Sequence, residues 1–285
     1  MKRSSIPDSD LTDINCPVCD SGKRKFLYEE REFPVWKCVT CSHIYISPQP
    51  SNAFYAEYYG KSFHDETENA DLFESNRGDV YNQTIQAINQ YMQHRGDLLD
   101  VGAAFGGFLE YALKEGWRIH GIELNRSRYN KCKQRFSSEQ NSIFKCSTLE
   151  DAELNHTSFD AVVLINVIEH VKNPVDILKR VFELLRPGGC LVIRWPQFVY
   201  RGTLSAAPEH LHGFTGESIT TLFNKLGFIN VRDYWAGIGD FKKKNNLKKI
   251  ILAKIFSFCG RATIAFSFGR LQIPFVSRLT LGRKP

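Results

Sequence analysis

The sequence lacks any long hydrophobic run. No stretch of about 18 uncharged apolar residues occurs, so we expect no helix that spans a membrane. The first ten residues, MKRSSIPDSD, also lack the apolar segment of a secretory signal, which predicts a cytoplasmic protein. With 42% hydrophobic residues, the 285-residue chain can form one large domain and a small module.

Acidic side chains are absent from residues 241–285, which hold eleven Lys and Arg. The net charge of +6 therefore arises in this tail, and the rest of the chain is slightly acidic. The overall charge consequently says little about what the main domain binds. No internal repeat or low-complexity tract stands out.

Four of the eight cysteines form two close pairs near the N-terminus. The pairs are Cys16-Pro-Val-Cys19 and Cys38-Val-Thr-Cys41, with eighteen residues between them. This spacing is typical of a four-Cys zinc site, in which a closed tetrahedron of thiolates leaves no position for water. We therefore expect a structural zinc ribbon over residues 1–47, where the metal supplies stability that so small a core lacks. The alternative is four unrelated buried thiols.

Strand-like and helix-like segments alternate from residue 77 onward. We expect strands over Asp97–Val101, Trp117–Glu123, Ile143–Cys146, Phe159–Asn166 and Cys190–Trp195, and helices over 77–94, Phe108–Glu115, 126–136 and 174–186. Such alternation predicts an α/β fold, with a doubly wound, mostly parallel sheet covered by helices on both faces. Ligands of these sheets bind beyond the carboxyl ends of the strands.

The loop after the first of these strands is rich in glycine. It reads Asp100-Val-Gly-Ala-Ala-Phe-Gly-Gly, and Gly102 and Gly106 allow the backbone to turn tightly against a ligand. Glu123 ends the next strand, where an acid can accept hydrogen bonds from both ribose hydroxyls. These features alone also fit a fold that binds NAD.

Four longer segments narrow the range of protein families that fit the sequence. They are LLDVGAAFGGFL, IHGIEL, SFDAVVLINVIEHVKNPVDILKRVFELLRPGGCLVIRWP and PEHLHGFTGESITTLFNKLGF. Together they resemble the class I S-adenosylmethionine-dependent methyltransferases of the small-molecule type, in the subgroup with an N-terminal four-Cys zinc ribbon. The resemblance covers about half of the chain, residues 97–235. It implies a seven-stranded Rossmann-like sheet with an antiparallel last strand, which VSRLTLGRK would supply after GFINVRDYW.

The resemblance also implies a site for S-adenosylmethionine. It assigns this site to Asp100, Gly102, Ala104, Gly106, Glu123, Leu124, Leu149, Glu150, Asn166 and Val167. Asp100 and the glycines would hold the methionyl part, Glu123 the ribose, and Leu149 and Glu150 the adenine. Ala104 departs from the family pattern Gly-x-Gly-x-Gly, so a cofactor-binding scaffold without catalysis stays an alternative.

Three histidines are candidates for catalysis. His170 follows the fourth strand, and neutral imidazole suits removal of a proton from an acceptor hydroxyl; a loop-packing role is the alternative. Similar quinone-pathway O-methyltransferases have E-x-x-E-H here and hold a divalent ion, whereas this chain has Asn166 in place of the first acid. His210 and His212 are expected on the loop after the fifth strand, either lining the acceptor pocket or at the surface.

Two further segments carry separate predictions. Residues 48–76 read as a linker or lid, whose aromatic residues Phe54, Tyr55, Tyr58 and Tyr59 either exclude water from the cofactor or pack against the ribbon. Within the methyltransferase domain, residues 77–285, the segment 242–275 reads as a basic amphipathic insertion before the last strand. It suits an anionic membrane surface, a sheet edge or, less well, nucleic acid.

These observations favour a methyltransferase that acts on a small-molecule, sugar or lipid-linked acceptor, most simply at oxygen. An RNA methyltransferase is the alternative enzyme. Against it, the chain lacks the Asn/Asp-Pro-Pro-aromatic motif that base-amine methyltransferases carry after the fourth strand.

Overall fold

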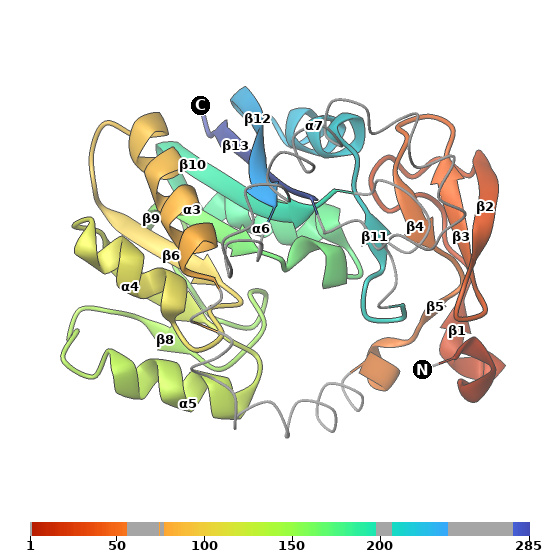
Figure 1. Cartoon of the computed structure of the whole chain (residues 1–285), viewed down its shortest axis with the longest axis horizontal. Helices are drawn as coiled ribbons and strands as arrows, with labels where there is room; N and C mark the ends of the chain where they lie inside the picture. Colours follow the sequence, from red (N-terminus) through yellow and green to blue (C-terminus); the bar gives the residue numbers. More distant parts are fainter. Residues whose placement is uncertain (1, 56–73, 75–76, 198–206, 239–275) are drawn as a thin grey trace, which may run out of the picture.

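The computed structural model describes residues 2–55, 74, 77–197, 207–238 and 276–285 (Figure 1). The lid candidates Tyr58 and Tyr59 and the basic segment 242–275 lie outside these residues. Within the described part of the chain, no helix is long and apolar enough to cross a bilayer.

A seven-stranded sheet forms the centre of the molecule, in the order β12-β13-β10-β9-β6-β7-β8 (Figure 1). Its strands are β6 (Asp97–Val101), β7 (Arg118–Ile122), β8 (Phe144–Lys145), β9 (Phe159–Ile165), β10 (Leu185–Pro196), β12 (Ile229–Ile238) and β13 (Val276–Arg283). Only β13 is antiparallel to its neighbours, β10 and β12. The predicted doubly wound, mostly parallel sheet with an antiparallel last strand is confirmed.

Helices cover both faces of this sheet. They are α3 (Gly78–Tyr91), α4 (Gly107–Lys114), α5 (Arg126–Arg135), α6 (Pro174–Leu184) and α7 (Gly216–Lys225). Alternate residues of β6 point to opposite faces: Leu98 packs in the core that contains α3 and α4, and Leu99 in the core that contains α6 and α7. Local signals start the helices, since the Asn173 side chain caps α6 and a Thr215–Ser218 capping box begins α7.

The N-terminal part of the chain forms two small sheets. Strand β1 (Leu11–Thr12) pairs with β5 (Gln49–Pro50), and β2 (Arg24–Glu30), β3 (Phe33–Cys38) and β4 (Ile44–Ile46) form a meander. Short 3-10 turns, η1 (Arg3–Ser5) and η2 (Asp8–Asp10), precede them.

A strand from far along the chain completes this meander. Strand β11 (His212–Gly213), which follows β10 in sequence, pairs antiparallel with β4, so the sheet order is β11-β4-β3-β2 (Figure 1). We call these four strands the N-terminal sheet. The Tyr55 hydroxyl donates a hydrogen bond to the Pro208 carbonyl at 2.7 Å. For this aromatic residue, the contact fits the alternative of a packing role. The boundaries 1–47, 48–76 and 77–285 stay predictions.

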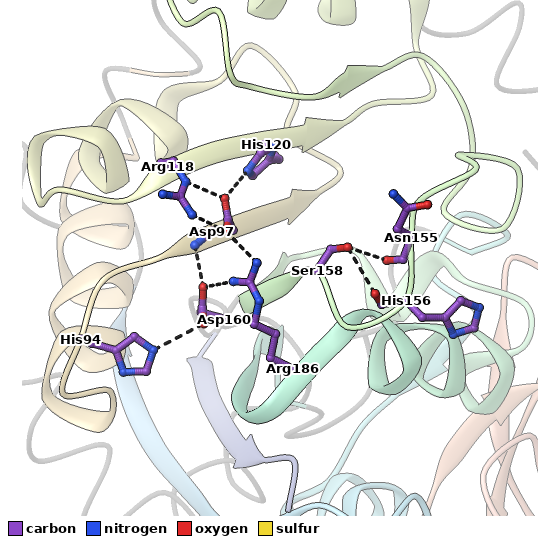
Figure 2. Close-up of polar contacts among 9 residues, drawn as sticks. All are labelled: His94, Asp97, Arg118, His120, Asn155, His156, Ser158, Asp160 and Arg186. Atoms are coloured by element: carbon purple, nitrogen blue, oxygen red, sulfur yellow. Dashed lines mark hydrogen bonds and ion pairs between the residues drawn. The ribbon is translucent and has the colours of Figure 1, made fainter.

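A network of charged side chains joins the amino ends of the central strands (Figure 2). Asp97, the first residue of β6, accepts from Arg118 Nη2 at 2.6 Å, Arg186 Nη2 at 3.0 Å and His120 Nε2 at 3.1 Å. Asp160 accepts from the Asp97 amide and from Arg186. Hydrogen bonds from Arg118 hold the pKa of Asp97 well below its usual range. The amino ends of the strands therefore serve stability, and the opposite, carboxyl ends remain for ligands.

Candidate functional site

The glycine loop at the carboxyl end of β6 needs small residues for two reasons. Gly102 and Gly106 have φ values of 79° and 84°, in the left-handed region. A Cβ on Gly102 would also stand 2.6 Å from the Val167 side chain, and one on Gly106 would stand 2.6 Å from the Phe136 ring. The loop after β9, which contains Val167, therefore packs directly against the glycine loop.

Ala104, the departure from the family pattern, also adopts a left-handed conformation, with φ 48°. Its amide donates to Glu123 Oε2 at 2.9 Å, and the Asn125 amide donates to Glu123 Oε1 at 2.8 Å. The buried Glu123 carboxylate thus joins the glycine loop to the loop after β7. The loop that contains Ala104 is thus hydrogen-bonded to this acid.

Three carboxylates gather at the glycine loop. Asp100 is buried, its Oδ1 has no hydrogen-bond partner among the described residues, and burial followed by the nearby Glu123 and Glu74 raises its pKa well above the usual value. The Glu74 carboxylate lies where a side chain on Gly107 would stand. Such a cluster attracts a cation and disfavours a pyrophosphate. Sequence reasoning missed Glu74, because nothing in the local sequence links it to a loop thirty residues away.

The other predicted cofactor residues lie on loops at the same edge of the sheet. Leu124, just after β7, is 58% exposed, which leaves an apolar surface for a flat ring. Asn166 ends β9 in a left-handed conformation, and its buried Oδ1 has no partner within the described structure. Leu149 is buried in the core and Glu150 is exposed. The orphaned oxygens of Asp100 and Asn166 fit a site that holds a polar ligand.

His170 ends a short 3-10 turn, η4 (Ile168–His170), after β9. Its Nδ1 lies 3.0 Å from the Glu209 carbonyl, and its Nε2 lies 3.9 Å from Glu169 Oε1. The His210 ring meets the His170 ring edge-on, with 4.6 Å between centroids. Burial lowers the pKa of His170 to about 3, so its imidazole is neutral at pH 7.

Glu169 is a site residue that our sequence assignment did not include. Its side chain is fully buried, its Oε2 has no hydrogen-bond partner in the part of the chain that the structure describes, and burial raises its pKa to about 8. Perturbed carboxyl groups of this kind are common at functional sites. Its position beside His170 in the Ile-Glu-His motif was the available signal.

His212 occupies a packed position, and neither the expected pocket lining nor a surface location describes it. Its Nε2 lies 2.7 Å from the Val171 carbonyl and its Nδ1 3.1 Å from His43 Nε2. Both rings are buried, and His212 also packs against Phe214. Because both nitrogens of His212 are engaged within the protein, we assign it no role in contacting an acceptor.

The four predicted metal-binding cysteines do come together. The Sγ atoms of Cys16, Cys19, Cys38 and Cys41 all lie within 4.8 Å of one another. The Cys16–Cys41 and Cys19–Cys38 pairs are each 3.5 Å apart. A tetrahedral zinc ion with bonds of about 2.3 Å requires separations of about 3.8 Å, so the four thiols fit the metal.

A second group of possible ligands lies in the candidate active site. One donor atom each of Glu169, His170 and His210 lies within 4.8 Å of the others. A carboxylate with two imidazoles suits a divalent transition metal.

Comparisons with known proteins agree with this geometry. Residues 99–191 match the family described as “Methyltransferase domain”. The chain is 24% identical over 167 residues to phosphoethanolamine N-methyltransferase 2 of Caenorhabditis elegans, covering 53% of this chain and 37% of that protein. It is 30% identical over 110 residues to a ubiquinone biosynthesis O-methyltransferase of Coxiella burnetii, covering 38% of this chain and 47% of that protein. The matches thus span less than half the length of these curated relatives.

Solved structures share the fold. Phosphoethanolamine N-methyltransferase 2 of Haemonchus contortus, in complex with S-adenosyl-L-methionine, aligns with a TM-score of 0.60 at 18% identity, over 85% of this chain and 63% of that one. A SAM-dependent methyltransferase of Archaeoglobus fulgidus aligns with a TM-score of 0.56 at 18% identity, over 75% and 98% of the two chains. Residues 99–191 therefore match a methyltransferase domain, and the chain shares the fold of S-adenosylmethionine-dependent methyltransferases of known structure.

Proposed function

We propose that this protein is an S-adenosylmethionine-dependent methyltransferase that methylates a small-molecule, sugar or lipid-linked acceptor at an oxygen atom. The observation that carries the proposal is the convergence of Glu74, Asp100 and Glu123 on the glycine loop. S-adenosylmethionine has a sulfonium and an ammonium group, which these carboxylates attract. The same carboxylates repel the pyrophosphate of NAD, so they separate two cofactors that a glycine loop alone does not.

Different residues contact different parts of the cofactor. Glu123 accepts from ribose hydroxyls, Asp100 and the glycine loop hold the methionyl part, and Leu124 covers the adenine. Leu149 and Glu150 complete the adenine side. When bound, S-adenosylmethionine supplies an activated methyl group, and the protein has to place an acceptor in line with it and remove the acceptor proton.

His170 is the proposed base. Its Nδ1 faces a carbonyl, which can only accept a hydrogen bond, so Nδ1 carries the proton and the Nε2 lone pair is free to take another. Glu169 Oε1 lies 3.9 Å from this nitrogen, and burial raises the pKa of Glu169 to about 8, so its carboxyl group is largely neutral at pH 7. An acceptor hydroxyl needs such a base, and this supports oxygen as the methylated atom.

We propose one zinc ion on the four N-terminal cysteines, with a structural role, because their geometry forms a closed set of four thiolates. We also propose that the protein is cytoplasmic and that residues 242–275 make peripheral contact with anionic membranes. These two proposals are supported by the sequence composition alone.

Binding of S-adenosylhomocysteine, measured by calorimetry, tests the function. Glu123→Ala should weaken binding by about 1–3 kcal/mol, because ribose hydroxyls lose their acceptors and the glycine loop loses its anchor. Glu123→Gln should lose less, since its amide oxygen still accepts from the Ala104 amide. Glu217→Ala, on the exposed first turn of α7, is the matched control and should bind as the wild type does. The proposal fails if the wild-type protein does not bind the ligand.

A further inference from the structure

The segment from Glu209 to Phe214 connects the candidate active site to the N-terminal sheet. The Leu211 amide donates to the Glu169 carbonyl at 2.9 Å, and the Leu211 carbonyl accepts from the Ile46 amide at 3.1 Å. One residue therefore bonds on one side to the turn that holds the candidate base and on the other to β4. Strand β11 then continues along β4, with His212 opposite Tyr45.

The same segment sets the orientation of His170. The Glu209 carbonyl, 3.0 Å from Nδ1, selects the tautomer whose free lone pair is on Nε2, and the His210 ring packs edge-on against the imidazole. A shift of residues 209–210 would move both contacts at once. The tautomer and orientation of the base thus depend on where this segment is held.

A chain of two buried imidazoles holds it. The Val171 carbonyl requires a proton on His212 Nε2, so His212 Nδ1 is an acceptor and His43 Nε2 is its donor. His43 in turn lies in the loop of the second cysteine pair, where its carbonyl accepts from the Cys38 amide at 2.8 Å. The contacts therefore run without a gap from the cysteine loop, through His43 and His212, to the residue that follows His170.

We propose that His212 and His43 are positioning residues for His170, and that the N-terminal sheet is by this route a working part of the active site. This proposal rests on the proposed function, because it assigns His170 as the base. Loss of the imidazole pair should loosen residues 209–211 and let His170 populate both neutral tautomers, while the glycine loop and Glu123, which lie on other elements, keep their arrangement.

The test uses the full-length protein with ¹⁵N-labelled histidine, whose ring nitrogen shifts report the tautomer of each imidazole. His170→Gln identifies the signals of His170. His212→Phe keeps the ring packing and removes both hydrogen bonds; we expect the His170 signals to move from one tautomer to an average of two, with the Kd for S-adenosylhomocysteine unchanged within about twofold. His212→Gln, whose amide can still donate to the Val171 carbonyl, should restore the wild-type pattern. His156→Phe, at an exposed histidine, is the control.

If His212→Phe does not fold, His43→Phe provides the second test, because it leaves the bond from His212 to Val171 in place and removes only the link to the cysteine loop. A folded variant of either kind with unchanged His170 signals overturns the proposal, as does a wild-type His170 without a proton on Nδ1. Failure of the function is a separate outcome: absence of S-adenosylhomocysteine binding removes the cofactor assignment, but the tautomer measurement needs no ligand.

Discussion

Asp97 offers a sharp test of the view that the amino edge of the central sheet serves stability. Its carboxylate joins β6 to Arg118 of β7 and to Arg186, and it also accepts from the buried His120. Asp97→Asn keeps the size of the side chain and removes the charge. Three donors, two of them cationic, would then share one amide oxygen.

The expected loss of stability depends on how exposed Asp97 and its ion-pair partners are. Breaking a fully buried ion pair costs about 3–5 kcal/mol, and an exposed pair contributes about 0–1 kcal/mol. The Asp97 side chain is 12% exposed, whereas that of Arg118 is 64% exposed and can return to water. We therefore expect a loss of about 2–3 kcal/mol in the free energy of unfolding, or about 3–5 °C in Tm for a chain of 285 residues.

Urea and thermal unfolding at pH 7 measure this loss. Asp8→Asn breaks an exposed ion pair with Arg3, in which the Asp8 side chain is 87% exposed, and should change stability by less than about 1 kcal/mol. The pH dependence of stability also checks the sign of the contribution of Asp97. Because the folded pKa of Asp97 lies below its unfolded value of 3.8, its contribution is present above that value and lost as pH falls further.

The difference between wild type and Asp97→Asn should therefore be constant from pH 7 to about 5 and narrow below about 4. Binding of S-adenosylhomocysteine at pH 7 should not change, since the cofactor loops lie at the opposite ends of the strands. A variant as stable as the wild type, or a difference that widens in acid, would refute the reasoning.

Three further predictions concern other parts of the chain. Elemental analysis of the wild-type chain should find one zinc ion, and Cys16→Ser should lose this ion and lower Tm, whereas Cys146→Ser, outside the cluster, should keep the metal; wild-type protein without zinc contradicts this. Ala104→Gly should raise the free energy of unfolding by about 0.5–1 kcal/mol, because relief of a left-handed alanine outweighs the added chain entropy; a loss in urea unfolding would show that the loop is unstrained. Through residues 242–275 the protein should co-sediment with anionic but not neutral vesicles, and less so when salt rises from 0.1 to about 0.5 M; equal, negligible pelleting with both lipids excludes the membrane contact.

Local patterns predicted the central sheet well. The run Asp97–Val101 is a strand to the residue, because short apolar segments between polar turns have few other solutions in an alternating chain. The glycine loop and Glu123 lie together for the same reason, since carboxyl ends of adjacent parallel strands share one edge. Strand β10 begins earlier than expected, at Leu185, because a bulge lets the segment before Cys190 pair with β9.

Contacts between distant segments were the features that the sequence did not reveal. Strand β11 has two residues, and its pairing with β4 depends on tertiary packing and on no propensity of its own. The sequence therefore predicted a loop position for His212, whereas its side chain is buried and hydrogen-bonded to His43. Glu74 was missed for a similar reason: its contact with Gly107 joins segments about thirty positions apart in the sequence.

The pairing of β11 with β4 also has a consequence during synthesis of the chain. His43 and His212 are 169 positions apart, so the ribosome finishes the cysteine module long before its outer strand exists. Until then β4 is an open sheet edge, of the kind that pairs readily with other chains. Closing so long a loop is also slow. The β4 edge of the newly made N-terminal segment therefore stays without this partner until residues 212–213 have been synthesised.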